Sequence, residues 1–281
     1  MTTTTTTCGS TGSEATHHSR TLSEFYPVIS DDRASGAGHH LITRSYPTGD
    51  VELTSLRLSS DDSLKKGGGA TRRNTSKDEM CESVLRKSCQ RAKTQIRRKC
   101  LSLQADRLLT ITFRKNETDI DLAWKKFKYF CTLMRWRYGE RFQYVAVPEY
   151  QKRGAVHYHL AVRGWYHYNT VRRLWARASG DSGGNVDFTG IVKRHGKTER
   201  NPRKIANYIS KYISKADSVT FNKRRYSSGG KIEVPSPVYG WLAITDAAVY
   251  HLCTLVEKMT PKPVNNIWEA EGRYPIICIS T

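Results

Sequence analysis

A short apolar stretch that carries two histidines constrains this chain most. Residues 155–162 read AVHYHLAV, and such a short apolar run favours a buried β-strand. Side chains two positions apart on a strand point to the same face of a sheet, so His157 and His159 would lie side by side. An isolated pair of this kind more often faces solvent or hydrogen-bonds its neighbours, so further residues must decide its role.

A tandem repeat of tyrosine and lysine is the second constraint. Residues 208–215 read YISKYISK. Asn201 followed by Pro202 is typical of a helix start, because Asn caps the free N–H groups and Pro fits the first turn. We therefore expect a helix over residues 204–216, on which Tyr208 and Tyr212 share a face. The helical periodicity places both tyrosines where the apolar side of the helix meets a basic flank.

The lysines of the repeat suit the chemistry of a tyrosine nucleophile. A phenol is a weak nucleophile at its usual pKa of about 10, and it needs a nearby cation that favours the phenolate. Lys211 and Lys215 each follow a tyrosine by three residues, which would place each ammonium beside one hydroxyl. The alternative is that the two tyrosines only pack their rings against a sheet.

A carboxylate precedes the two histidines. Glu149 lies on the segment that should form a β-hairpin with the histidine strand. Two imidazoles and one carboxylate suit a catalytic divalent cation that keeps open positions for water or a phosphate oxygen. We expect Mg²⁺ or Mn²⁺ bound by His157, His159 and Glu149, although the histidines alone would also accept zinc.

The charge of the chain indicates a polyanionic partner. The formal net charge of the 281 residues is +20, which a nucleic acid would neutralise. Residues 190–231 hold twelve Lys and Arg against two Asp and Glu, a net of 12 − 2 = 10, half of the total. This cluster predicts nucleic-acid binding. The candidate DNA-binding residues are Arg153, Lys193, Arg194, Arg203 and Lys204.

Composition and periodicity divide the chain into four parts. Residues 1–77 are rich in Thr, Ser, Gly and charge, so we expect a long disordered tail. Residues 78–104 alternate apolar and basic positions, which suits a helix with a basic face. Residues 105–218 should form the compact domain, and residues 219–281 a C-terminal extension with an apolar segment at 238–245 and a helix at 246–259.

The compact domain has a recognisable order of elements. Hydrophobic periodicity predicts strands at 108–113, 142–149, 155–163 and 185–192, and helices at 119–138, 168–178 and 204–216. This order of strand, helix, strand, strand, helix, strand, helix is typical of an α+β fold of the RRM-like or ferredoxin-like kind. We expect an antiparallel sheet packed with helices.

Cysteine usage and hydropathy bear on the cellular compartment. The seven cysteines form no CxxC pair and are odd in number, so neither a zinc ribbon nor a complete disulfide framework is indicated. No apolar run reaches the ~18 residues that a membrane span needs, and no secretory signal is evident. We expect a soluble protein without a membrane partner, with reduced thiols in a cytoplasm.

Together, three segments resemble the three motifs of the HUH endonucleases. The similarity is greatest to the two-tyrosine rolling-circle replication initiators of small single-stranded DNA phages and related plasmids. Residues 108–113 look like the first, structural motif of the family. Residues 149–160 are similar to its metal-binding motif, with Tyr158 at the hydrophobic position, and residues 208–215 to its catalytic motif.

The resemblance implies a reaction as well as a fold. One tyrosine would attack a phosphodiester at a replication origin, leaving a 5′-phosphotyrosine and a free 3′-hydroxyl that a host DNA polymerase extends. The second tyrosine would cut the regenerated origin, and the freed hydroxyl would reseal the strand. No GxxxxGK[ST] run is present, so a host helicase would open the duplex. The expected partners are origin DNA and single-stranded DNA in the cytoplasm of a bacterial host.

Other functions fit parts of the sequence. A non-catalytic module could stack single-stranded bases on Tyr144, Trp165, Tyr166 and Tyr168. A nucleotide hydrolase with a histidine nucleophile would want a third alternating histidine, and that position is Ala161. Within the HUH endonucleases, a relaxase or a transposase is a further alternative.

Overall fold

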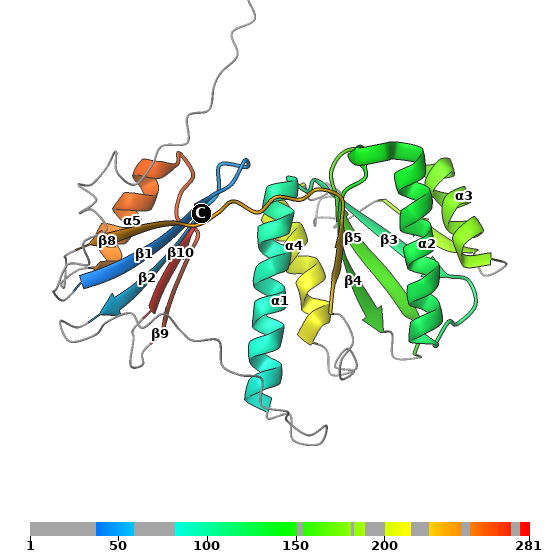
Figure 1. The fold of residues 1–281 in the computed structure, drawn as a ribbon, viewed down its shortest axis with the longest axis horizontal. Helices are drawn as coiled ribbons and strands as arrows, with labels where there is room; N and C mark the ends of the chain where they lie inside the picture. Colours follow the sequence, from blue (N-terminus) through cyan, green and yellow to red (C-terminus); the bar gives the residue numbers. More distant parts are fainter. Residues whose placement is uncertain are drawn as a thin grey trace, which may run out of the picture.

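The computed structural model describes residues 38–58, 82–150, 154–180, 183–188, 200–214, 225–242, 248–270 and 276–281. The described chain forms two antiparallel five-stranded sheets with helices packed on them. The long helix α1 (Glu82–Leu103) lies between the two sheets (Figure 1). The predicted α+β class is therefore confirmed, and α1 matches the basic helix expected within residues 78–104.

The first sheet has the strand order β6-β3-β5-β4-β7. Its strands are β3 (Arg107–Phe113), β4 (Tyr144–Tyr150), β5 (Val156–Val162), β6 (Gly183–Asp187) and β7 (Ser227–Gly229). The helices α2 (Ile120–Tyr138) and α3 (Tyr168–Ser179) connect them. Numbered along the chain, β3 to β6 take the order 4-1-3-2, which is the ferredoxin-like arrangement predicted from the sequence.

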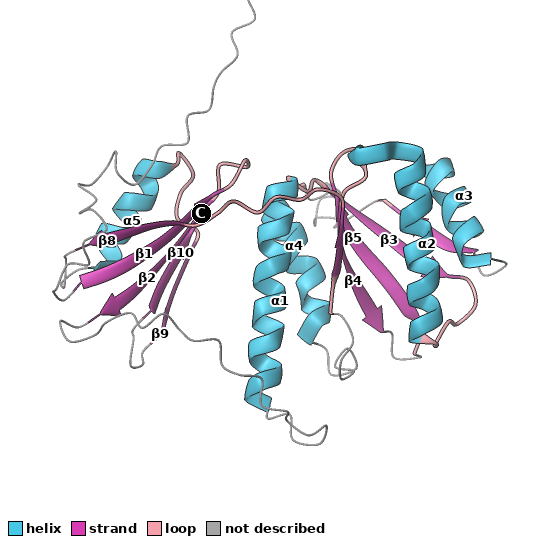
Figure 2. Ribbon diagram, viewed as in Figure 1, coloured by secondary structure: helices cyan, strands magenta, loops and turns pink. Residues whose placement is uncertain are grey.

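Helices cover both faces of the first sheet (Figure 2). On one face α2 and α3 bury a core that includes Phe127, Phe130 and Trp175. On the other face α1 and α4 (Pro202–Ser210) bury a second core that includes Ile96 and Ile205. The sheet feeds both cores because successive side chains of a strand alternate between its faces.

The helix that carries the tyrosines begins as predicted and ends differently. Asn201 caps α4, since its Oδ1 accepts hydrogen bonds from the backbone N–H groups of Arg203 and Lys204 at 2.9 and 3.2 Å. The α-helix ends at Ser210 and continues as the 3₁₀ turn η4 (Lys211–Ser214). The expectation of one α-helix to residue 216 is therefore wrong at Lys211, because the chain tightens to 3₁₀ geometry, as helix ends often do. Residues 215 and 216 lie outside the described residues.

The second sheet joins both ends of the described chain. Its order is β8-β1-β2-β10-β9. The strands are β1 (Gly38–Ser45), β2 (Val51–Leu58), β8 (Val238–Leu242), β9 (Asn266–Ala270) and β10 (Ile276–Ser280). Helix α5 (Ala248–Met259) packs on one face and buries Leu53 and Leu255.

The second sheet corrects one prediction. Residues 38–58 were expected to belong to a tail without structure, and they form β1 and β2. Their partners β8 and β10 lie almost two hundred residues away, so composition within a local window carries no sign of them. Residues 1–37 and 59–77 of the predicted tail lie outside the described residues.

Buried carboxylates link the second sheet to the helices of the first. Glu52 of β2 accepts hydrogen bonds from Nε of Arg97 at 2.7 Å and from Nε of Arg98 at 3.1 Å, both on α1. Arg203 of α4 donates to Oγ of Ser280 at 2.7 Å and lies 3.4 Å from Asp50. The two sheets are thus held together through α1 and α4.

The remaining sequence expectations concern thiols and membranes. The five cysteines of the described residues are free: Cys89, Cys100, Cys131, Cys253 and Cys278. Over the same residues, no helix combines the length and the apolar character that crossing a membrane requires.

Replacing Glu52 tests the contact between the sheets. Burial alone would raise the pKa of the Glu52 carboxyl, but Arg97 and Arg98 hold that pKa below its usual value. Glu52→Gln should lower the free energy of unfolding by about 2–3 kcal/mol, because hydrogen bonds to charged groups are lost from a buried site. Urea unfolding at pH 7 measures the change.

The pH dependence of the same variant follows from the sign of the shift. A carboxyl whose pKa folding lowers adds stability above the pKa of the unfolded chain and loses it as the pH falls through the folded-state pKa. The stability gap between wild type and Glu52→Gln should therefore narrow in acid. Glu233→Gln is the control, because Glu233 and its partner Lys231 are 76% and 79% exposed and such pairs contribute little. An equal effect of both variants would contradict the prediction.

Candidate active site

Strand register brings the predicted site residues to one face of the first sheet. In β5, His159 lies opposite Thr110 of β3, and His157 lies opposite Glu149 of β4. Ala161, two residues after His159, packs in the core beneath α1 and α4. Because side chains alternate along a strand, both histidines belong to this same face, toward the tyrosine helix.

Both ring nitrogens of His159 are held. Its Nε2 lies 2.8 Å from Oε2 of Glu149, and its Nδ1 lies 3.0 Å from Oγ1 of Thr110. The residue is only 5% exposed. The carboxylate and the hydroxyl therefore fix the orientation of the imidazole from two neighbouring strands.

The two tyrosines meet this histidine. The ring of Tyr212 stacks on the ring of His159, with 4.4 Å between centroids and 6° between planes, and Tyr208 stands edge-on to it at 6.1 Å. The Tyr212 hydroxyl donates a hydrogen bond to the Tyr208 hydroxyl at 3.2 Å. The structure thus brings together the tyrosine pair, one of the two histidines and Glu149.

Lys211 covers the tyrosine pair. Its ammonium lies 3.9 Å from the centroid of the Tyr208 ring and 4.9 Å from that of Tyr212. Such positions favour a cation because of the negative face of the aromatic ring. One lysine therefore serves both rings, where the sequence predicted one lysine for each hydroxyl. Lys215, the second predicted lysine, lies outside the described residues.

The environments of the two hydroxyls differ. Tyr212 is 5% exposed. Burial raises its pKa well above the usual value, and the hydrogen bond to Tyr208 and the charge of Glu149 act in the same direction. Tyr212 therefore keeps its proton and donates it to the half-buried Tyr208.

The predicted metal ligands are placed in part. Within the described residues, no three side chains of the His, Cys, Asp and Glu types converge in the way that a metal-binding group requires. Glu149 and Nε2 of His159 are in contact, and strand register puts His157 directly opposite Glu149. Two nitrogen donors and one carboxylate on adjacent strands have the chemistry that a divalent cation accepts. The metal site stays a prediction.

The predicted DNA-binding residues fall into three groups. Lys204 is exposed on α4. Arg203, predicted to bind DNA, instead points into the contact between the sheets, and its side chain is 16% exposed. The other predicted DNA-binding residues lie outside the described part of the chain: Arg153, Lys193 and Arg194.

Sequence reasoning missed Thr110. It was seen only as part of a structural strand, yet its hydroxyl holds the imidazole of His159. Alternation in β3 would have placed Thr110 and Thr112 on the face opposite to the buried Leu109 and Ile111. That alternation shows which face Thr110 is on, but not which residue of another strand it meets.

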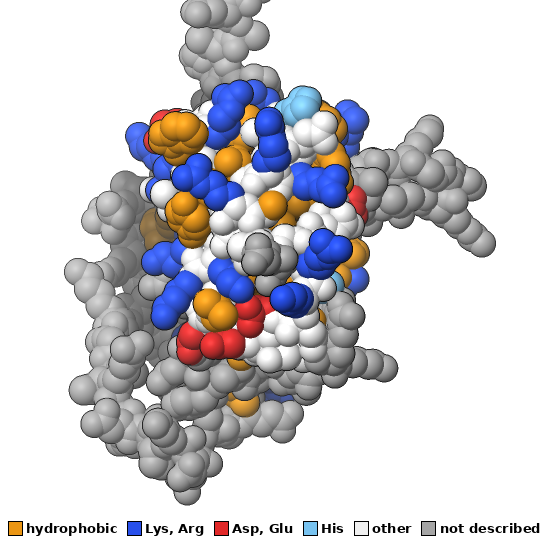
Figure 3. Space-filling view, turned by 90° about the vertical axis from the view of Figure 1, so that its right-hand side faces the viewer, with side chains coloured by type: hydrophobic (Ala, Val, Ile, Leu, Met, Phe, Trp, Pro, Cys, Tyr) orange, Lys and Arg blue, Asp and Glu red, His pale blue; other side chains and the backbone are white. Residues whose placement is uncertain are grey.

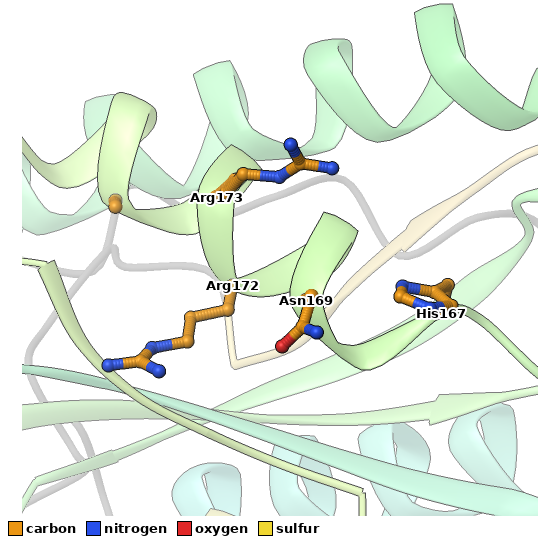
Figure 4. A pocket seen from close by; sticks show the side chains of 5 residues that line it. His167, Asn169, Arg172 and Arg173 are labelled. Carbon is orange, nitrogen blue, oxygen red and sulfur yellow. The ribbon is translucent and has the colours of Figure 1, made fainter.

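A hollow on α3 is separate from this site. It is lined by His167, Asn169, Arg172, Arg173 and Ala176. Figure 4 shows Arg172 and Arg173 extending from α3 in different directions, with Asn169 nearby. Because α3 packs on the face of the sheet opposite to α4, the hollow takes no part in the arrangement around Tyr208.

The comparisons with known proteins agree with the site. Residues 106–217, less than half of the chain, match the model of a family described as Replication-associated protein ORF2. The matched segment begins just before β3 and ends after η4, so it contains every residue of the candidate active site. No curated protein and no solved structure matches the chain. This part of the chain is therefore similar to replication-associated proteins.

The packing of Tyr212 predicts how the protein tolerates substitution there. Tyr212→Phe should cost about 1 kcal/mol of stability, because it removes one hydrogen bond and keeps the ring against His159. Tyr212→Ala should cost about 3 kcal/mol or more, because it leaves a cavity in the core. Thermal unfolding measures both, and equal losses for Phe and Ala would contradict the stacked arrangement.

Proposed function

We propose that this protein initiates rolling-circle DNA replication by nicking one strand at an origin. The observation that carries the proposal is the convergence of Tyr208, Tyr212, His159 and Glu149 within a segment that is similar to replication-associated proteins. A phenol pair beside an imidazole and a carboxylate has no role in packing that apolar residues would not fill better. The net charge of +20 suits a DNA substrate.

In this proposal Tyr208 is the first nucleophile. Its oxygen accepts a hydrogen bond from Tyr212, and the Lys211 ammonium lies over its ring. Both contacts favour the phenolate over the neutral phenol. The phenolate oxygen would attack the scissile phosphorus, the bond to the 3′ oxygen would break, and that oxygen would take up a proton. A 5′-phosphotyrosine and a free 3′-hydroxyl result.

Tyr212 has the second role. While Tyr208 reacts, Tyr212 stays protonated and donates a hydrogen bond to the attacking oxygen. After Tyr208 carries the 5′-phosphate, Tyr212 is the remaining hydroxyl of the pair and can attack the regenerated origin. Because a phosphotyrosine keeps the energy of the phosphodiester, the freed 3′-hydroxyl can reseal the strand without ATP.

The histidines and Glu149 are proposed to hold a divalent cation, Mg²⁺ or Mn²⁺. When bound, the ion would polarise the scissile phosphate and stabilise the charge that develops on it. Thr110 would orient His159 from behind through Nδ1, in the way that outer partners orient ligating imidazoles. The proposed partners are origin DNA, single-stranded DNA, and a host helicase and polymerase. The proposed location is the cytoplasm of a bacterial host.

A non-catalytic RNA- or DNA-binding module is less well supported. Such a module stacks bases on an open sheet face, whereas helices cover both faces of the first sheet. Two of the four aromatic residues assigned to it, Tyr144 and Tyr166, are 6% and 0% exposed. They belong to the core and cannot receive bases.

The decisive experiment looks for a covalent adduct. The protein is incubated with circular single-stranded DNA of its own replicon in Mn²⁺ or EDTA, and products are separated by denaturing electrophoresis. We expect a Mn²⁺-dependent adduct that Tyr208→Phe abolishes in the first turnover. Tyr212→Phe should retain the adduct but slow its formation roughly tenfold, as the loss of about one hydrogen bond would. Adducts formed equally well by both single variants would contradict the assigned order.

Thr110 is a positioning residue with its own test. Thr110→Val should weaken Mn²⁺ binding about 10–100-fold, the usual effect of losing an outer partner of a ligating histidine. Calorimetric titration with Mn²⁺ measures the affinity without any DNA. Thr112→Val is the matched control, because the Thr112 hydroxyl bonds to the backbone of Asn185 instead of a histidine. Unchanged Mn²⁺ affinity in Thr110→Val would remove the assigned role.

A further inference from the structure

The outer surface of α2 and α3 carries an unusual concentration of positive charge. We call the exposed side chains of these two helices the outer helical face. From α2 its cations are Lys125, Lys128, Arg135 and Arg137. From α3 its cations are Arg172, Arg173 and Arg177. The two helices together contain one acidic residue, Asp121, which lies in the first turn of α2.

Exposed aromatic rings lie among these cations. Trp136 is 79% exposed and Tyr129 is 43% exposed. They are seven residues apart on α2, so they lie on the same side of the helix and about 10 Å apart. In Figure 3 Lys and Arg side chains surround scattered hydrophobic side chains over this face, and acidic side chains lie at its edges.

This face is distinct from the candidate active site. Helices α2 and α3 pack on one side of the first sheet, and the tyrosines lie on the other side with α4. None of its residues contributes to the core, because the inward sides of both helices supply Phe130 and Trp175 for that purpose. Folding therefore does not explain why Trp136 is left in solvent within a field of like charges.

We propose that the outer helical face binds single-stranded DNA independently of sequence. Binding to unpaired strands combines cations that follow the phosphates with rings on which unstacked bases lie. The face supplies both elements along α2, which is ~28 Å long, and α3 adds three guanidinium groups. An acidic peptide would satisfy the cations but would have no need of flat exposed rings.

This inference rests on the proposed function only for the identity of the polymer. A strand held behind the sheet would stay on the protein while its cut end is retained by a tyrosine. The surface would thus bind the unwound strand away from the origin, and origin recognition would remain with the residues near Tyr208.

The test measures binding in a background that cannot cut. The double variant Tyr208→Phe/Tyr212→Phe is titrated with a labelled polythymidine oligonucleotide over a range of salt concentrations, and binding is followed by fluorescence anisotropy. Adding Arg172→Gln, Arg173→Gln and Arg177→Gln should reduce the slope of log K against log salt by about 2, since each phosphate contact on a single strand contributes about 0.7. Adding Trp136→Ala should weaken binding about tenfold through the loss of one stacked base.

Matched controls and the catalytic assay separate the outcomes. Lys231→Gln and Tyr250→Ala remove a cation and a ring that are 79% and 71% exposed outside this face, and both should leave affinity and slope unchanged. With its tyrosines restored, Trp136→Ala should still nick a short origin oligonucleotide, so a failure of nicking in wild type would count against the proposed function alone. Unaltered polythymidine binding in the Trp136 and arginine variants would overturn the inference. So would a Trp136-dependent affinity for polyglutamate in place of polythymidine, which would assign the face to an acidic protein.

Discussion

The candidate site depends on how α4 and η4 pack on the first sheet. Ile205, Ile209 and Ile213 are 0%, 0% and 1% exposed, and this apolar side fixes the rotation of the segment about its axis. Once that rotation is set, Tyr212 must lie against the sheet, where it meets the ring of His159. Tyr208, one turn earlier, lies at the edge of the same contact. Burial of apolar surface, at about 25 cal/mol per Å², therefore positions the reactive hydroxyls before any polar contact forms.

The polar contacts then make the two tyrosines unequal. A buried phenol loses hydration that would stabilise its phenolate, so burial raises the pKa of Tyr212 and makes it a hydrogen-bond donor. Its acceptor is the Tyr208 oxygen, which also lies beneath the Lys211 ammonium. Two residues of the same type, four positions apart, thus acquire different chemistry from their surroundings alone. The transition from α-helix to 3₁₀ turn falls between them.

Local patterns predicted what local physics determines. The cap at Asn201, the alternating histidines of β5 and the amphipathic helix from Ile120 to Tyr138 each follow from a few neighbouring residues. Features set by distant parts of the chain could not be predicted in this way. The hydroxyl of Thr110 gains its role only because β3 pairs with β5 in one register, and β1 and β2 are strands only because β8 and β10 complete their sheet.

The second sheet bears on the site through α1. That helix is buried on two sides: Ile96 packs with α4 under the first sheet, while Arg97 and Arg98 on its next positions reach Glu52 of the second sheet. A charged contact of this kind is stabilising only while all its members stay paired, because removing one leaves a buried charge without compensation. Since Arg203 of α4 bonds to Ser280 in the same contact, the tyrosine helix is held from both sheets. The strands at the two ends of the described chain thus act as a brace for the helix that carries the candidate nucleophiles.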